Sequence, residues 1–439
     1  MTARPLLIEA APQPWPRGPH PFILGLHRLS LGLLVFTGAF VVFDGPYNAA
    51  FIFAAVVMIA GGARLNAPLA PMIVITLVYV MGGLASLIGN NLDDFIPQRY
   101  IFTMFFLACT AFYFAMVIQE ETTRRIDIIR KATIASAVIS CFIGLIGFFD
   151  VAGLAQYFRV YEGRASGTFR DPNVFGSFLI LPAIFLLQDL IVGRRGLWWR
   201  ATAFLLIALM IFLSFSRGSW VAFALAGAML FVLTAVTERD KAGRLMAMSL
   251  AALIVFALLA VAVLSIDDIR SVFEQRAKLL QSYDEGRFGR FGKLVYALPL
   301  MLENPNGLGP LRFRNFFFED PHNVYLNGFV NFGWLGGLSY LALIVSTCVV
   351  GFKICMQPSP WRREAIAIFC SLFTQVLQGF QIDTNTWRHF NMMIGLIWGI
   401  MAAWTLMKKR AKEAPRAHSA PPPTAVQAAI PASAIIAAR

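Results

Sequence analysis

Successive apolar runs of about 20 residues dominate this chain of 439 residues, and they constrain its fold more than any other feature. Only 14% of the residues are charged, against about 25% in a typical soluble domain, whereas 58% are hydrophobic. A chain of this composition has too few polar side chains to cover a water-soluble globule. The sequence therefore predicts an all-α polytopic membrane protein with about 12 transmembrane helices.

The expected helices are the apolar runs between charged residues and Pro or Gly breaks. They are 22–43, 47–63, 68–89, 100–118, 132–149, 174–192, 199–215, 219–236, 245–264, 325–350, 365–381 and 389–407. The resulting domains are a cytoplasmic Pro-rich N-terminus at 1–21, transmembrane helices one to nine within 22–264, a loop domain at 265–324, helices ten to twelve within 325–407, and a disordered cytoplasmic tail at 408–439.

The positions of Lys and Arg predict the orientation. Placing both termini in the cytoplasm puts most of the 37 basic residues in cytoplasmic segments, as the positive-inside rule requires. The long segment 265–324 then lies outside, and its basic and acidic residues balance. It contains two amphipathic stretches, 269–283 and 291–302, so we expect a helical domain on the membrane surface. The net charge of +13 follows the topology and gives no reason to expect nucleic acid as a partner.

The sequence gives little support for a metal or cofactor. All five cysteines fall in or beside apolar runs without a CxxC pair. Acidic pairs in the outer segment, Asp267 with Asp268 and Asp284 with Glu285, are weak candidates for a metal site. We therefore expect no metal and no cofactor.

Arginines on the outer side are the first candidate functional residues. Arg217 stands in SFSRGSW, a short break between two apolar runs. An isolated arginine there could simply snorkel to the interface, but others on this side also stand beside Gly, Ser or Asn, where a solvated face would include lysine. They are Arg164, Arg170, Arg287, Arg290, Arg312 and Arg314. Guanidinium groups bind phosphate oxygens bidentately, which suits a diphosphate at the bilayer edge. Ion pairs with neighbouring acidic residues are the alternative role.

A histidine is the second candidate. His322 and Asn323 follow Pro321 at the start of PHNVYLNGFVNFGWLGG, where the outer segment enters the tenth span. A neutral imidazole with a pKa near its usual value of about 6.5 accepts a proton from a sugar hydroxyl near neutral pH. A hydrogen-bonded packing role is the alternative. For His389, at the outer end of the last span, we expect a change to Ala to be mild.

Three stretches, in the same order, resemble the O-antigen ligase and O-antigen polymerase superfamily of bacterial envelope glycan enzymes. They are SFSRGSW, then GRFGRFGKLVYALPLMLENPNGLGP with its Pro-x-Gly-x-Gly turn, then PHNVYLNGFVNFGWLGG, and they cover about 214–337. A softer likeness to exopolysaccharide-type members lies in GTFRDPNVFGSF. This resemblance implies a metal-independent, inverting glycosyltransferase of the bacterial inner membrane. Its active site would be periplasmic and its donor a glycan on undecaprenyl diphosphate.

The resemblance also assigns roles to residues. Arg217 matches the arginine that binds the diphosphate, His322 the histidine that activates the acceptor hydroxyl, and Arg290 the arginine upstream of the loop helix, with Arg287 as a near duplicate. The remaining candidates for substrate binding are Arg164, Arg170, Arg312, Arg314 and Asn323. Leu294 stands where many members have Trp.

Several alternatives stay open. A transporter or flippase for lipid-linked sugars would have the same layout, although mid-span charges and internal repeats are scarce here. The acceptor could be lipid A core for a ligase, a second lipid-linked repeat for a polymerase, or a protein serine.

Overall fold

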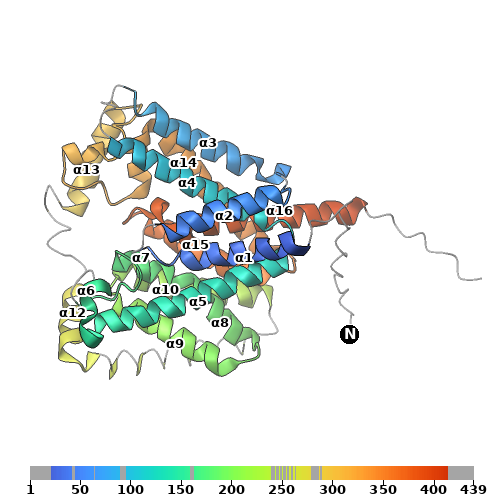
Figure 1. Cartoon of the computed structure of the whole chain (residues 1–439). Coiled ribbons are helices and arrows are strands. Elements are labelled where there is room, and N and C mark those ends of the chain that lie inside the picture. Colours follow the sequence, from blue (N-terminus) through green and yellow to red (C-terminus); the bar gives the residue numbers. More distant parts are fainter. Residues whose placement is uncertain are drawn as a thin grey trace, which may run out of the picture.

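The chain folds into a bundle of helices, and the part of the chain that the structure describes contains no strand (Figure 1). This computed structural model describes residues 21–413 except 42–44, 64, 89–94, 159–162, most of 239–263, and 278–288 apart from Gly286. The all-α class predicted from the sequence is confirmed for these residues.

Apart from the short α6, the helices of the N-terminal half follow the expected apolar runs. They are α1 (Pro21–Thr37), α2 (Pro46–Ala60), α3 (Ala70–Ala85), α4 (Phe95–Val117), α5 (Thr122–Phe148), α6 (Ala155–Phe158), α7 (Pro172–Phe178), α8 (Ile180–Val192), α9 (Leu197–Leu213) and α10 (Arg217–Thr237). The expected span at 245–264 lies mostly outside the described residues.

The C-terminal half supplies the outer segment and the last expected spans. Its helices are α12 (Asp267–Ala277), α13 (Arg290–Glu303), α14 (Val324–Met356), α15 (Arg362–Gln378) and α16 (Arg388–Glu413), with short 3-10 turns at Arg312–Asn315 (η4) and Thr384–Thr386 (η5). Helices therefore occupy both amphipathic stretches of the outer segment, the first of them in part.

Seven helices among the described residues are long and apolar enough to cross a membrane. They are Ala67–Ala85, Phe95–Val117, Thr122–Phe148, Pro172–Val192, Arg217–Thr237, Val324–Met356 and Arg388–Glu413. Three shorter apolar helices, α1, α2 and α9, also coincide with expected spans. A multi-pass membrane protein is thus supported, while the full number of about 12 spans stays a prediction.

Small residues let the long helices approach closely. Gly395 and Gly399 of α16 pack against the backbone of Ala111 and Ala115 in α4. Gly82 of α3 lies against Gly336 of α14, where a β-carbon would come within 2.6 Å of the backbone nitrogen. Such contacts are typical of helix pairs in membranes, because lipid supplies no hydrophobic driving force between helices.

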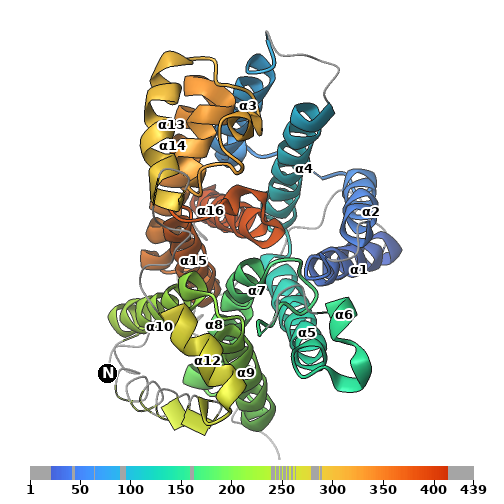
Figure 2. The same ribbon diagram turned by 90° about the vertical axis from the view of Figure 1, so that its left-hand side faces the viewer.

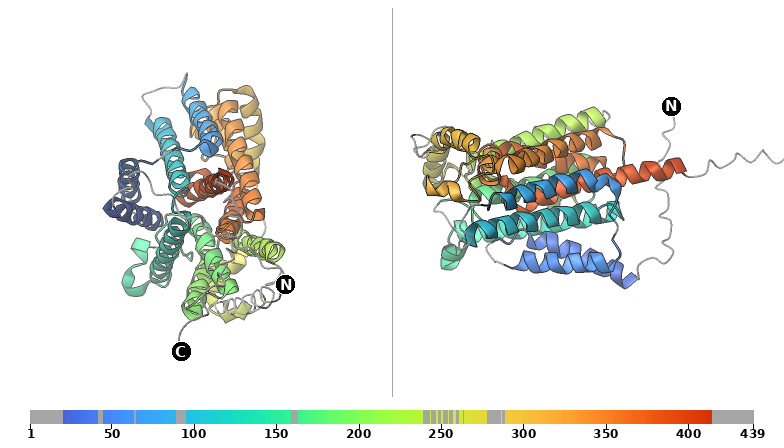
Figure 3. Two further views of the ribbon diagram at one scale, coloured as in Figure 1. Left: turned by 90° about the vertical axis from the view of Figure 1, so that its right-hand side faces the viewer. Right: turned by 90° about the horizontal axis from the view of Figure 1, so that it is seen from above.

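The helix ends form two distinct faces of the bundle. Helices α12 and α13 both lie at one end of the bundle, which we call the loop end (Figure 1). The view from above shows the long helices running from this end to the opposite one (Figure 3). Seen from the loop end, α13 and α14 lie to one side and α10 and α12 to the other, with α15 and α16 between them (Figure 2). The predicted functional residues Arg217 and His322 belong to the two outer groups of helices, at the starts of α10 and α14.

The opposite end of the bundle carries a network of ion pairs. The carboxylate of Asp189 is buried and receives Arg130, Arg194 and Arg200. Arg363 donates two hydrogen bonds to Glu238, of 2.6 and 2.8 Å. These arginines are among those that the positive-inside rule assigns to the cytoplasm, and the bundle places them at one end.

Candidate functional site

Arg217 is held at the start of α10 by a tight turn. Phe215 adopts a left-handed conformation (φ 47°), and the Ser216 side chain caps the helix by accepting a hydrogen bond from the amide of Ser219 at 3.3 Å. Arg217 is the first helical residue and is half-buried. A helix N-terminus attracts anions because its amides are unpaired and its dipole is positive there. The guanidinium and the helix end therefore add to the same local positive field.

Aromatic packing attaches the outer segment to this turn. The indole of Trp220 donates to the carbonyl oxygens of Ile211 and Phe212, at 3.1 and 3.2 Å. The Trp220 ring also stacks on Phe273 of α12, with ring centroids 5.7 Å apart. The position of Arg217 is thus coupled to the placement of α12.

His322 lies at the other side of the loop end, beside the carboxylate of Glu319 and the amine of Lys293 that pairs with it. Its Nε2 is 3.3 Å from Oε2 of Glu319, and its side chain is 32% exposed. Lys293 of α13, which is buried, donates to the same Glu319 oxygen at 2.9 Å. The hydrogen bond from Lys293 holds the pKa of Glu319 below its usual value, so the carboxyl stays ionised beside the imidazole. A carboxylate in this position can orient the imidazole and stabilise its protonated form.

Asn323 caps α14 through its side chain. The carbonyl oxygen of this side chain accepts hydrogen bonds from the amides of Tyr325 and Leu326, both at 3.1 Å. These two hydrogen bonds occupy the side-chain oxygen of Asn323, which is the atom that could accept a hydrogen bond from a substrate hydroxyl. The substrate-binding role expected for Asn323 stays a prediction, and its observed contacts are those of a helix cap that positions His322.

The end of α15 brings the two motifs together. The amide of Val324 donates to the carbonyl of Gly379 at 2.8 Å, and the Tyr325 hydroxyl donates to that of Val376 at 2.5 Å. On the other side, a β-carbon added to Gly218 would lie 3.2 Å from Nε2 of Gln378. Arg217 and His322 thus flank the same turn of chain, although their motifs are about a hundred residues apart in the sequence.

The Pro-x-Gly-x-Gly turn enters a break in α14. Gly333 interrupts the helix with φ 65°, and the amide of Trp334 donates to the carbonyl of Pro305 at 2.8 Å. Gly307 has φ 80° and packs against the backbone of Asn331 and Gly333, where a side chain would clash. These glycines are needed for their conformation and close approach, so this motif fixes α13 to the first turns of α14.

The remaining predicted arginines are placed in different surroundings. Arg164 is buried and donates to the carbonyl of Ser214 and to Oδ1 of Asn173, at 2.9 and 3.0 Å, which suits a positioning role. Arg170 is exposed just before α7. Arg314 of η4 donates to Asp320 at 2.7 Å, and Arg312 begins the same turn. Arg290 begins α13, but its side chain and all of Arg287 lie outside the described residues.

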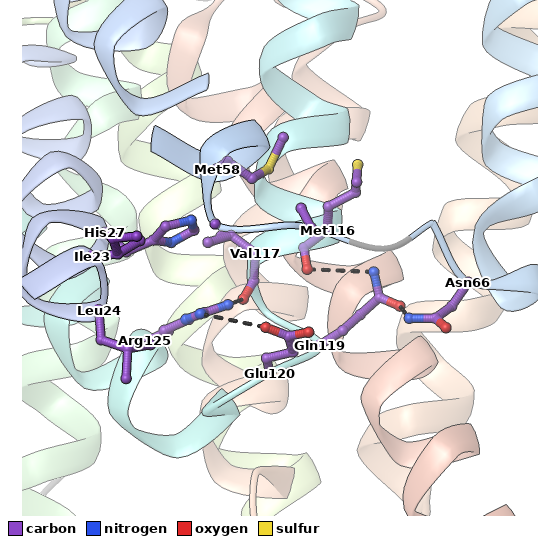
Figure 4. Close-up of a pocket in the computed structure, with 12 residues that line it drawn as sticks. Ile23, Leu24, His27, Met58, Asn66, Met116, Val117, Gln119, Glu120 and Arg125 are labelled. Carbon is purple, nitrogen blue, oxygen red and sulfur yellow. Dashed lines mark hydrogen bonds and ion pairs between the residues drawn. The ribbon is translucent and has the colours of Figure 1, made fainter. Parts of the chain in front are cut away.

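Two other features lie away from this site. A cavity of about 20 Å³ at the opposite end is lined by His27, Asn66, Gln119 and Arg125, among others, and the close-up shows Arg125 directed at Glu120 and the carbonyl of Val117 (Figure 4). His389 is buried against Trp387 and Phe178, with ring centroids 5.3 and 5.7 Å apart. The expectation that a change of His389 to Ala is mild stays a prediction.

Sequence reasoning named Glu319 only as a possible ion-pair partner of the outer arginines, and it missed Lys293 and two further carboxylates, Asp320 and Asp383. The spacing of Glu319 three residues before His322 was an available signal for the pair. Nothing local in the sequence relates Lys293 to Glu319 or Asp383 to Asp320, because their proximity depends on how α13 and the turn after α15 pack. Desolvation raises the pKa of Asp320 and brings that of Asp383 to about 7.

One family model matches the chain. Its description is O-Antigen ligase, and the match covers residues 202–341, from α9 through α10, α12 and α13 into α14. Both Arg217 and His322 fall inside it, as do the turn at Pro305 and the break at Gly333. No curated protein matches the chain.

Proposed function

We propose that the chain is an O-antigen ligase-like membrane protein and that it transfers or polymerises a glycan carried on undecaprenyl diphosphate at the periplasmic face of the bacterial inner membrane. The acceptor is lipid A core for a ligase or a second lipid-linked repeat for a polymerase. In this proposal the loop end faces the periplasm and both termini are cytoplasmic.

One observation carries the proposal. The helix start that carries Arg217 and the histidine beside an ionised carboxylate lie on either side of the Gln378–Gly379 turn, and Arg217 and His322 both fall inside the stretch that matches the family model. Group transfer from a diphosphate needs positive charge at the leaving group and a base at the attacking hydroxyl. The two halves of the site supply these functions separately.

The proposed reaction is a single displacement at the anomeric carbon of the donor. The acceptor hydroxyl oxygen forms the new bond to this carbon while its proton passes to the neutral imidazole of His322. The bond from the anomeric carbon to the diphosphate oxygen breaks, and its electron pair leaves with undecaprenyl diphosphate. Attack opposite the leaving group inverts the configuration. Glu319 stabilises the imidazolium that forms, much as a carboxylate does in other acid–base pairs.

The leaving diphosphate is stabilised by guanidinium groups in this scheme. Arg217 binds it bidentately, assisted by the amides at the start of α10. Arg290, with Arg287 as the alternative, is the second arginine proposed to bind it. Because arginine charge takes the place of a divalent ion, we propose that transfer is metal-independent.

A reconstituted assay tests the function. Purified protein in liposomes receives a fluorescent undecaprenyl-diphosphate oligosaccharide together with lipid A core or with a second lipid-linked repeat, in the presence of excess EDTA. Formation of the glycosylated acceptor and free undecaprenyl diphosphate supports the proposal, and the acceptor that is used distinguishes ligase from polymerase. Movement of the donor across the bilayer without transfer would identify a flippase. Restoration of lost transfer by Mg²⁺ would contradict metal independence.

A further inference from the structure

A chain of hydrogen-bonded polar side chains, buried at Asn327 and Asn331 and half-buried at Asp383, joins α14 to the turn after α15. The side-chain amide of Asn331 donates to Oδ1 of Asn327 at 2.8 Å. The side-chain amide of Asn327 in turn donates to Oδ1 of Asp383 at 3.0 Å. Asn327 and Asn331 belong to the part of α14 before its break at Gly333, whereas Asp383 lies in the turn between α15 and α16. Buried polar groups of this kind are costly unless each is hydrogen-bonded.

Two buried oxygens, one on Asp320 and one on Asn331, have no hydrogen-bond partner among the described residues, and Asp320 acts electrostatically on Asp383 of the same set. Asp320 is 5% exposed, and while its Oδ2 accepts from Arg314, its Oδ1 accepts nothing. Asn331 is 2% exposed, and its Oδ1 is likewise without a donor. Because native proteins rarely leave buried acceptors unpaired, these oxygens indicate a ligand that brings hydrogen-bond donors.

The charges around Asp320 favour a neutral ligand over a cation. Arg314 is 2.7 Å from Asp320, is 53% exposed, and acts electrostatically on Asp383 as well. A bound cation would be repelled by this guanidinium, whereas a hydroxyl group can donate to the carboxylate and accept from Arg314. The exposed side chain of Arg314 also gives this group a solvent-facing edge.

We propose that Asp320, Asp383 and Arg314 form a subsite for hydroxyl groups of the acceptor sugar, with Asn327 and Asn331 as its floor. This proposal rests on the proposed function, since it names the substrate that His322 would activate. Asp320 lies two residues before His322 and is influenced by its charge, and Asn327 lies just over one helical turn beyond it. A sugar anchored by some hydroxyls at this subsite would present another to the imidazole.

The test measures how acceptor and donor saturate the reaction in Asp320→Asn. This change keeps the shape and the oxygen that faces Arg314 but removes the charge. The acceptors are lipid A core and the undecaprenyl-diphosphate repeat, each purified from cells lacking the protein, and these two arms distinguish the source of the sugar. We expect the half-saturating concentration of the active acceptor to rise about 10-fold or more, and that of the donor to stay the same. Direct binding of the acceptor without donor, followed by thermal shift in detergent, should weaken in parallel.

Asp150→Asn is the matched control, because Asp150 also lies in a loop and accepts one hydrogen bond, from the amide of Ala155 at 2.9 Å. It should leave both saturation curves unchanged. A folded Asp320→Asn protein with an unchanged acceptor curve would overturn the subsite and leave the proposed function intact. A rise in donor half-saturation alone, or thermal stabilisation by Ca²⁺ or Mg²⁺ that depends on Asp320, would also overturn it. If the wild-type protein uses neither acceptor, the proposed function itself fails and the subsite with it.

Discussion

The amide of Val324 donates a hydrogen bond of 2.8 Å to the carbonyl of Gly379, and this bond ties the first residue of α14 to the residue that follows α15. Gln378, next to Gly379, lies against Gly218 at the start of α10. The turn after α15 is therefore the element that holds the Arg217 and His322 motifs in register. A site assembled in this way depends on both side chains and on the charge of their neighbours.

The bidentate hydrogen-bonding geometry of the Arg217 guanidinium should matter for transfer as well as its charge. Arg217→Lys keeps a positive charge at the start of α10 but loses bidentate binding, so we expect transfer to fall about 100-fold at normal protein levels. Arg28→Lys is the control, because Arg28 pairs with Glu121 at the opposite end of the bundle, and it should transfer normally. Near-normal glycan assembly by Arg217→Lys would reduce Arg217 to an interfacial anchor.

Glu319 should act through His322. Glu319→Gln removes the charge that stabilises the imidazolium and breaks the ion pair with Lys293, so we expect kcat to fall about 10-fold with little change in either half-saturating concentration. Steady-state rates in detergent give both quantities. Glu303→Gln, on the exposed end of α13, serves as the control and should change neither. An unaltered kcat in Glu319→Gln would mean that the carboxylate only stabilises the structure of the loop and does not assist His322.

Hydropathy predicted most of the described helices, since its signal is local, and motif order singled out Arg217 and His322, whose roles stay predictions. The start of α10 at Arg217 and the start of α14 after Asn323 follow from Ser and Asn caps that the sequence displays. The break at Gly333 was not predicted, because it depends on Pro305 and Gly307 packing into α14 from the preceding segment. Contacts between segments that are distant in the sequence leave no local pattern comparable to a capping residue.

The stability of the protein should depend on pH through Asp383. Desolvation raises the pKa of this carboxyl from 3.8 to about 7. Between about pH 4 and 7 the folded chain therefore keeps a proton that the unfolded chain has released, and the free energy of unfolding falls as the pH rises through this window. Asp383→Asn resembles the protonated form, so its thermal midpoint in detergent should fall less than that of the wild type between pH 5 and 8. Parallel curves for the two proteins would contradict the raised pKa.

The orientation can be measured with single cysteines. Asn315 is exposed at the end of η4, whereas Ser359 lies between α14 and α15 at the opposite end. In whole cells with a permeable outer membrane, Asn315→Cys should react with a membrane-impermeant maleimide, and Ser359→Cys should react only after lysis. The unchanged chain, with its five cysteines, gives the background. Labelling of Ser359→Cys alone in whole cells would show that the chain has the opposite orientation in the membrane.

The measurement that tests the central claim most directly compares transfer and donor binding in His322→Ala. If His322 takes the proton of the acceptor hydroxyl, transfer of the fluorescent glycan by the reconstituted variant should fall about 10²- to 10⁴-fold, while binding of the undecaprenyl-diphosphate donor stays close to that of the wild type. Asn315→Ala, in the same loop, should change neither quantity. Unchanged transfer in His322→Ala, or loss of donor binding in a variant that is still folded, would contradict the assignment of His322 as the base.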